Sequence, residues 1–204
     1  MKSLKVRIML LEEALGMSTT SKQIYRDYLA DKAPDAASRD EEIERIGVDA
    51  VAEKGRTVFP KDEAGTPFWW DYQLKGFLKD TCDGLRDFSE YVKKEKRLSK
   101  WLYKRTIDKL IFTNPRRIMM VLPEGGKIGL CERTLRAQTM QGERISLASS
   151  ETVPAGTVFD VEFLCMDESL EKLVLECLSY GRHRGLGAWR NSGKGIFDYE
   201  LIGK

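Results

Sequence analysis

The sequence predicts an α+β fold, in which antiparallel strands and helices form two layers around one core. Several segments alternate apolar and polar residues with a period of two, which is typical of half-buried strands. Other segments repeat apolar residues at helical spacing and lie between those strands. With a helical insertion and an extra β-hairpin set aside, the order is β-α-β-β-α-β, that of the ferredoxin-like split βαβ unit.

The first strand is predicted near the N-terminus, where Leu4, Val6, Ile8 and Leu10 alternate with polar or exposed positions. After Gly16 the pattern becomes helical, and residues 18–55 are predicted to be a helical insertion. Within it, Ser38 and Glu41 form a capping box, and residues 31–53 are rich in Asp and Glu. The whole chain, 1–204, is read as one domain that carries this acidic insertion.

A helix is predicted to begin near Asp71, which is a plausible N-cap, with Leu74, Phe77 and Leu78 as its apolar face. Lys75 and Lys79 lie four residues apart in it and therefore share one exposed side.

Residues 92–105 carry seven Lys or Arg side chains against the single acid Glu95, with Leu98, Trp101 and Leu102 at helical spacing. Two interpretations are open for this segment. It is either an ordinary solvated face of a helix or a basic stripe that lies near a phosphate backbone.

The C-terminal half is predicted to be mainly strands, with one strongly amphipathic helix that Asp167 caps and Gly181 ends at C′. A turn at Gln141-Gly142 makes residues 133–150 a thumb-like hairpin. The predicted strands are 118–122, 128–137, 145–148, 158–163 and 197–201.

The segment 181–195 reads Gly-Arg-His-Arg-Gly-Leu-Gly-Ala-Trp-Arg-Asn-Ser-Gly-Lys-Gly and contains no acid. Glycines let a backbone approach a phosphate closely, arginines donate forked hydrogen bonds to it, and Trp189 can stack on a base. The nucleotide-triphosphate loop pattern fails, because Ala188 and Gly195 stand where Gly and Ser or Thr are required. A flexible connection remains the other interpretation.

Composition and rare residues exclude several classes. The four cysteines form no CxxC pair and His183 is the only histidine, which argues against a zinc or redox site and a serine-type triad. We therefore expect free thiols in a reducing compartment, with no metal and no cofactor. No apolar run is long enough for a signal peptide or a membrane span, so a cytoplasmic protein without a membrane partner is predicted. The net charge of +2 makes no case for nucleic acid by itself.

Three stretches together resemble the RAMP superfamily of CRISPR-associated proteins. The segment 181–195 resembles its glycine-rich loop in both composition and position. Residues 66–79, which include Leu74-Lys75-Gly76, look like the entry into its first helix. Residues 151–159, Glu-Thr-Val-Pro-Ala-Gly-Thr-Val-Phe, look like its "Glu-x-Val-Pro-x-Gly-Thr-x-Phe" strand entry.

The resemblance implies an RRM-like fold that binds single-stranded RNA, usually guide RNA in a multisubunit ribonucleoprotein. A homo-oligomer, or a stand-alone relative from a phage, a prokaryote or another mobile element, is equally compatible. The hairpin 133–150 occupies the place of the hairpin that separates bases in such subunits. The candidate RNA-binding residues are Lys75, Lys79, Arg182, His183, Arg184, Trp189, Arg190, Asn191 and Lys194.

Departures from the family pattern leave three functions open. Lys61-Asp62 matches the pair found in target-cleaving subunits, but Arg56 stands near the place of their aspartate. The favoured function is therefore a non-catalytic RNA-binding module. The first alternative is a metal-independent endoribonuclease in which His183 acts as acid or base beside Lys75 or Tyr72. The second is a protein-interaction subunit or mimic that engages a CRISPR-type complex through Trp69 and Trp70.

Overall fold

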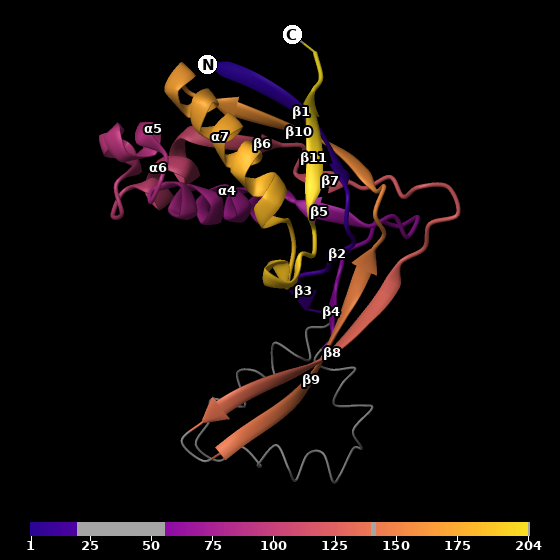
Figure 1. Ribbon diagram of the computed structural model, residues 1–204. Coiled ribbons are helices and arrows are strands. Elements are labelled where there is room, and N and C mark those ends of the chain that lie inside the picture. The colour runs from indigo at the N-terminus through magenta and orange to yellow at the C-terminus, as the bar shows by residue number, and fades with distance from the viewer. Residues whose placement is uncertain (20–55, 140–141, 204) are drawn as a thin grey trace, which may run out of the picture. The chain divides into compact units, whose positions relative to one another are not determined.

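The computed structural model describes residues 1–19, 56–139 and 142–203 (Figure 1). The chain divides into two compact units, which are treated separately below. Unit 1 comprises residues 1–14, 60–127 and 153–204, and unit 2 comprises residues 15–59 and 128–152. The insertion 18–55 therefore lies almost wholly outside the described residues, and so does the first residue of the predicted Gln141-Gly142 turn.

Unit 1 is built on a four-stranded antiparallel sheet in the order β11-β1-β10-β6. The two central strands are β1 (Lys2–Leu10) and β10 (Val158–Cys165), and the edges are β11 (Phe197–Leu201) and β6 (Ile111–Asn114). Ile8 lies opposite Phe159 on one side and Tyr199 on the other. The alternation predicted for the first strand is confirmed, since Leu4, Val6, Ile8 and Leu10 are all buried.

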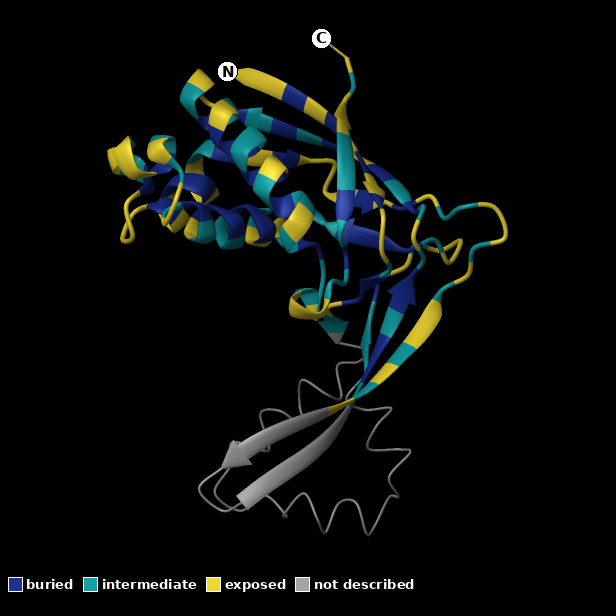
Figure 2. Ribbon diagram, viewed as in Figure 1, coloured by how far each residue is buried: buried dark blue, intermediate teal, exposed yellow. Residues whose placement is uncertain are grey.

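Two long helices, α4 (Asp71–Leu85) and α7 (Glu168–Arg184), cover the buried face of this sheet. Figure 2 shows buried residues recurring along both helices and alternating along the strands. Gly181 permits the close approach of the helices, because a Cβ there would lie 2.1 Å from the Phe77 ring. Phe77 in turn meets Phe197 of β11 edge to face at 5.8 Å. The predicted α+β class is confirmed.

One strand was missed and another misplaced. Ile111–Asn114 joins the main sheet as β6, although the sequence pattern suggested no strand there. The strand predicted at 118–122 is shorter, and as β7 (Arg117–Met119) it pairs with β5 (Phe68–Trp70) in a separate two-stranded sheet. The four residues of β6 are too few to display a clear alternation.

The helix ends are partly as predicted. Asp167 caps α7 by accepting a hydrogen bond from the Leu170 amide at 3.0 Å, as expected. Asp71 is not the N-cap of α4; Trp70 is, and the Gln73 side chain accepts its amide hydrogen bond at 2.9 Å. Gly181 does not end α7, which continues to Arg184 and stops at Gly185 with φ 84°.

The basic segment 92–105 is not one continuous helix. It divides into α5 (Glu90–Lys94), a 3₁₀ turn η1 (Lys96–Leu98) and the start of α6 (Tyr103–Leu110). Leu98, Tyr103, Thr106 and Ile107 are buried and anchor this part of the chain to the core, whereas residues 99–102 are exposed.

Unit 2 contains a sheet to which β3 (Ser18–Thr19), β4 (Thr57–Val58), β8 (Gly129–Thr139) and β9 (Gly142–Val153) contribute, along with β2 (Ala14–Leu15) at its margin. The predicted hairpin is present and longer than expected, since β8 and β9 pair from Gly129↔Thr152 to Thr139↔Gly142. Its base is tied to β4, where Thr57 Oγ1 donates to Ser150 Oγ at 2.7 Å.

The described residues contain no helix of the length and apolar character that a membrane crossing requires. Within the same residues, no cluster of three or more His, Cys, Asp or Glu side chains could hold a metal ion. All four cysteines are free, as predicted. Burial raises the pKa of the Cys82 and Cys165 thiols to about 12, so these thiols stay protonated and unreactive.

Candidate nucleic-acid interface

The last turn of α7 and the loop that follows it form the glycine-rich segment, residues 182–195. The loop folds back on itself, because the Leu186 amide donates to the Gly195 carbonyl at 2.8 Å. A Cβ at Gly195 would lie 1.8 Å from the Leu186 carbonyl oxygen, and one at Gly185 would lie 2.4 Å from that of Lys194. Both glycines also have positive φ, so only glycine allows this conformation. The glycines therefore fold the loop against its own backbone, so the segment is not a loose connection, while its close approach to a phosphate stays a prediction.

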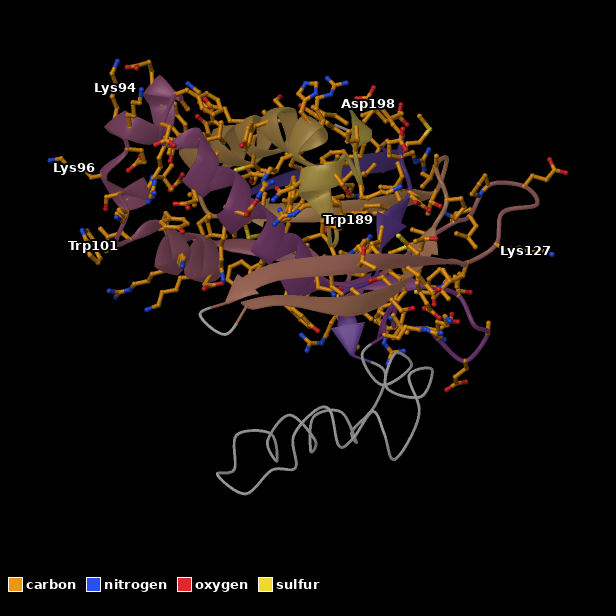
Figure 3. The ribbon with its side chains drawn as sticks, turned by 60° about the horizontal axis from the view of Figure 1, so that its bottom comes forward. Lys94, Lys96, Trp101, Lys127, Trp189 and Asp198 are labelled. Carbon is orange, nitrogen blue, oxygen red and sulfur yellow. The ribbon has the colours of Figure 1, made fainter. Side chains whose placement is uncertain are left out.

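Trp189 lies on this segment (Figure 3). It has a left-handed backbone, with φ 56° and ψ 34°, and its side chain is 39% exposed. A short 3₁₀ turn, η2 (Arg190–Ser192), follows it and is closed by the Ser192 hydroxyl, which donates to the Trp189 carbonyl at 3.0 Å. Such a conformation is unusual for a bulky residue and is typical of functional sites.

Two arginines of the segment share one carboxylate. Arg190 donates to both oxygens of Asp80, at 2.7 and 3.2 Å, and Arg184 Nε donates to Asp80 Oδ2 at 3.2 Å. Arg184 also donates to the Asn191 side-chain oxygen at 2.7 Å. Asp80 lies on α4, so the pairing fixes the segment to the helix layer. Two guanidinium groups around one carboxylate leave an excess positive charge at this point.

The other cations of the segment are also paired. Arg182 binds Asp198 and Lys194 binds Glu13, each at 2.5 Å. The sequence interpretation rested on a segment without acids, and the structure corrects it: three carboxylates reach the segment, from α4, from β11 and from the residues that follow β1. The net charge available to a ligand is therefore smaller than the local count of Lys and Arg implies.

His183 is exposed on the last turn of α7. The described part of the chain offers its imidazole no hydrogen bond and no ion pair. The two residues proposed to assist it are engaged elsewhere: Lys75 Nζ lies 5.1 Å from the Phe112 ring centroid, and Tyr72 stacks on Trp70 at 6.3 Å. Nothing described here orients His183 as an acid or base, which requires a positioned partner.

Lys75 and Lys79 share one side of α4, as predicted, but both are half-buried against α6. Lys79 Nζ pairs with Asp108 at 2.6 Å, and Lys75 Nζ lies 3.4 Å from the Asp108 carbonyl oxygen. Asp80 faces α7 instead. The structure therefore brings Arg184, Arg190 and Asn191 together but links neither lysine to them.

Sequence reasoning missed a second group of cations at the start of α4. Arg116 and Arg117 each lie 5.7 Å from the Trp70 ring, and Arg117 also lies 5.6 Å from Phe68. Trp70 is half-buried, whereas its neighbour Trp69 is core, with 1% of its surface exposed. The Arg-Arg pair directly after Pro115 was visible in the sequence, but only the β5–β7 pairing brings it to the aromatic residues.

The face of the sheet opposite the helices is an unfavourable surface for RNA. RRM domains stack bases on aromatic residues of their central strands. Here the outward residues of β1 and β10 include no aromatic side chain, and Arg7 is already bound to Asp160 at 2.8 and 2.9 Å. Any RNA contact by unit 1 is therefore expected on the helix and loop side.

Comparison with known proteins shows which solved structures have a similar fold. No protein-family model and no curated protein matches the sequence. Among solved structures, the chain is similar to a chain of the cryo-EM structure of the Type III-B Cmr-beta bound to cognate target RNA, with a TM-score of 0.52, 13% identity and 98% of this chain covered. It spans 61% of the length of that Cmr-beta chain. Cmr6 from Pyrococcus furiosus matches with a TM-score of 0.49 and 12% identity, over 96% of this chain and 97% of that one. The likeness to the Cmr-beta chain is a likeness of fold.

Proposed function

We propose that this chain is a non-catalytic, single-stranded RNA-binding module of a multisubunit ribonucleoprotein, with a ferredoxin-like unit 1. The strand order β11-β1-β10-β6, with α4 and α7 on one face, supports that topology. The RNA bound to the Cmr-beta complex supports the ligand class. Compared with a catalyst, a binding module needs no positioned acid or base, and His183 has no described partner to orient it.

The observation that carries the proposal is the shared carboxylate of Asp80. Arg184 and Arg190 are held by it in fixed positions, yet one carboxylate neutralises only one of them. The surplus charge lies on a loop that glycines fold tightly and beside the half-exposed Trp189. Prepositioned arginines lose little side-chain freedom when they bind a phosphate, which favours affinity.

The test is equilibrium binding of a fluorescent single-stranded RNA to the full chain and to an Arg184→Ala/Arg190→Ala variant. We expect affinity to fall by about tenfold or more, with a shallower dependence on salt. The control variant, Lys5→Ala/Lys127→Ala, removes two exposed cations that have no described side-chain partner and should bind RNA almost as wild type. Equal affinities of the two double variants, both folded by circular dichroism, would disprove the role of the segment.

A further inference from the structure

The turn between η1 and α6 presents the most exposed large aromatic side chain among the described residues. Trp101 is 87% exposed and its neighbour Leu102 is 43% exposed. Figure 3 shows Trp101 projecting outward from the same end of unit 1 as Lys94 and Lys96. Tryptophan is enriched at binding interfaces, so the exposed Trp101 makes this turn a candidate contact site. Residues 96–105 are called the tryptophan turn below.

The tryptophan turn is anchored firmly, so the exposure of Trp101 does not come from a loose loop. Leu98 is fully buried, and the Thr106 hydroxyl donates to the Arg97 carbonyl at 2.8 Å. The Leu102 amide closes the turn on the Ser99 carbonyl at 2.9 Å. Arg97 then ties the turn to the start of α7 through Asp167 at 2.8 Å. A rigid turn holds an exposed indole ready for a partner at a low entropic cost.

Three cations of the tryptophan turn have no described partner. Lys96, Lys100 and Arg105 are exposed, and their side chains form no hydrogen bond or ion pair with the rest of the described chain. The nearby acids are used by other cations: Glu95 by Arg97, and Asp108 by Lys79. The turn therefore combines one flat aromatic face with flanking cations that remain available.

We propose that the tryptophan turn is a second contact site for single-stranded RNA, in which one base stacks on Trp101 and the adjacent phosphates meet Lys96, Lys100 and Arg105. The inference rests on the proposed function, since both sites take the same class of ligand. Single strands offer bases and phosphates in alternation, which matches an aromatic face flanked by cations. An acidic protein would fit less well, because one ring and one leucine are far smaller than the roughly 800 Å² per partner of a stable interface.

The test uses Trp101→Ala and Trp101→Phe in the full chain, with Leu201→Ala as the control for removing an exposed apolar side chain (56% exposed). Each protein is titrated against a single-stranded RNA and against the same RNA made abasic at every second position. We expect Trp101→Ala to bind the intact RNA about tenfold more weakly, since a base–aromatic stack has that order of effect. Trp101→Phe should retain most of the affinity, and the loss in Trp101→Ala should shrink on the abasic RNA.

The outcomes separate this inference from the proposed function. If Arg184→Ala/Arg190→Ala loses RNA while Trp101→Ala binds as wild type, the proposed function stands and the tryptophan turn is not an RNA site. A loss that is the same on intact and abasic RNA also overturns the stacking role. If Trp101→Ala keeps RNA but loses an acidic protein that wild type binds, the turn is a protein-docking surface instead. Wild type that binds no RNA refutes both proposals.

Discussion

The glycine-rich segment and the tryptophan turn are both basic in sequence, but they differ in whether their cations are paired with carboxylates. In the glycine-rich segment, Arg182, Arg190 and Lys194 each bind a carboxylate from another element. In the tryptophan turn, Lys96 and Lys100 have no described side-chain partner, although the turn itself is fixed to the core. The number of basic residues in a segment therefore does not predict how many of its cations lack a carboxylate partner. What decides it is the tertiary position of the acids.

This difference gives the two regions different functional potential. Paired arginines are preorganised, and a phosphate must compete with their carboxylates, which favours a ligand of matching geometry. Unpaired lysines attract any phosphate and give an affinity that falls steeply with salt. The pairing should appear in stability as well, because the cations of the segment support the fold, whereas Lys96, Lys100 and Arg105 of the turn do not. Four predictions test that contrast.

The largest effect on stability is expected for Gly195→Ala. Its Cβ would overlap the Leu186 carbonyl oxygen, and its φ of 71° is unfavourable for alanine, so the loop must rearrange. We expect the free energy of unfolding to fall by about 3 kcal/mol or more. Gly65→Ala is the matched control, since Gly65 also has positive φ (82°) but nothing lies within 4 Å of its Cβ. It should cost only about 1 kcal/mol. Similar urea midpoints for both variants would show that the segment is not tightly packed.

Arg190→Ala comes next. It removes two hydrogen bonds to Asp80 and leaves that half-buried carboxylate with Arg184 alone. We expect a loss of about 1 kcal/mol, measured by urea unfolding, because the pair is partly screened by solvent. Arg190→Lys keeps the charge but not the forked geometry and should recover less than half of the loss. Full recovery with lysine would mean that charge alone matters here.

The sequence predicted the elements that have a clear local pattern, and it failed where contacts between residues distant in the sequence decide the structure. The alternation in β1 and the periodicity of α7 are local patterns, and both elements were predicted correctly. The strand β6 was missed because its four residues show no clear alternation, and only its pairing with β10, for example Thr113 with Phe163, identifies it. The predicted end of α7 at Gly181 failed because that glycine serves helix packing against Phe77 and not chain reversal.

The candidate site was likewise predictable only in its local features. The glycines that fold the segment were recognisable, since positive φ and close backbone contact require glycine wherever they occur. The partners Asp80, Asp198 and Glu13 could not be assigned, because they lie on three other stretches of the chain. Trp101 was noted as part of a helical stripe, and its exposure appeared only when that stripe proved to be interrupted by a turn.

Asp167 should show a comparable effect, although it is half-exposed where it joins the tryptophan turn to α7. The Arg97 guanidinium, followed by the Ser169 hydroxyl, lowers the pKa of its carboxyl to about 2. A depressed acid pKa stabilises the fold above the unfolded value near 4, and that stabilisation is lost as the pH falls toward 2. We expect Asp167→Ala to cost about 1 kcal/mol at pH 7 through the lost helix cap.

Asp167→Asn separates the two roles of this residue, since asparagine still caps the helix but cannot pair with Arg97 as an ion. It should cost less than Asp167→Ala at pH 7, and its unfolding free energy should change less than that of wild type between pH 4 and pH 2. A wild-type slope that the Asn variant retains in full would assign the acid sensitivity to other carboxyl groups.

The smallest effect on stability is expected for Lys96→Gln/Lys100→Gln/Arg105→Gln. These side chains contact no described residue through a hydrogen bond or ion pair, so the free energy of unfolding should stay within about 0.5 kcal/mol of wild type. Binding should respond differently: three lost phosphate contacts on a single strand lower the slope of log affinity against log salt by about 2. A triple variant that is clearly destabilised, or one whose salt slope is unchanged, would remove the contrast between the turn and the segment. The combination of intact stability and reduced salt dependence is what a surface kept free for phosphates must show.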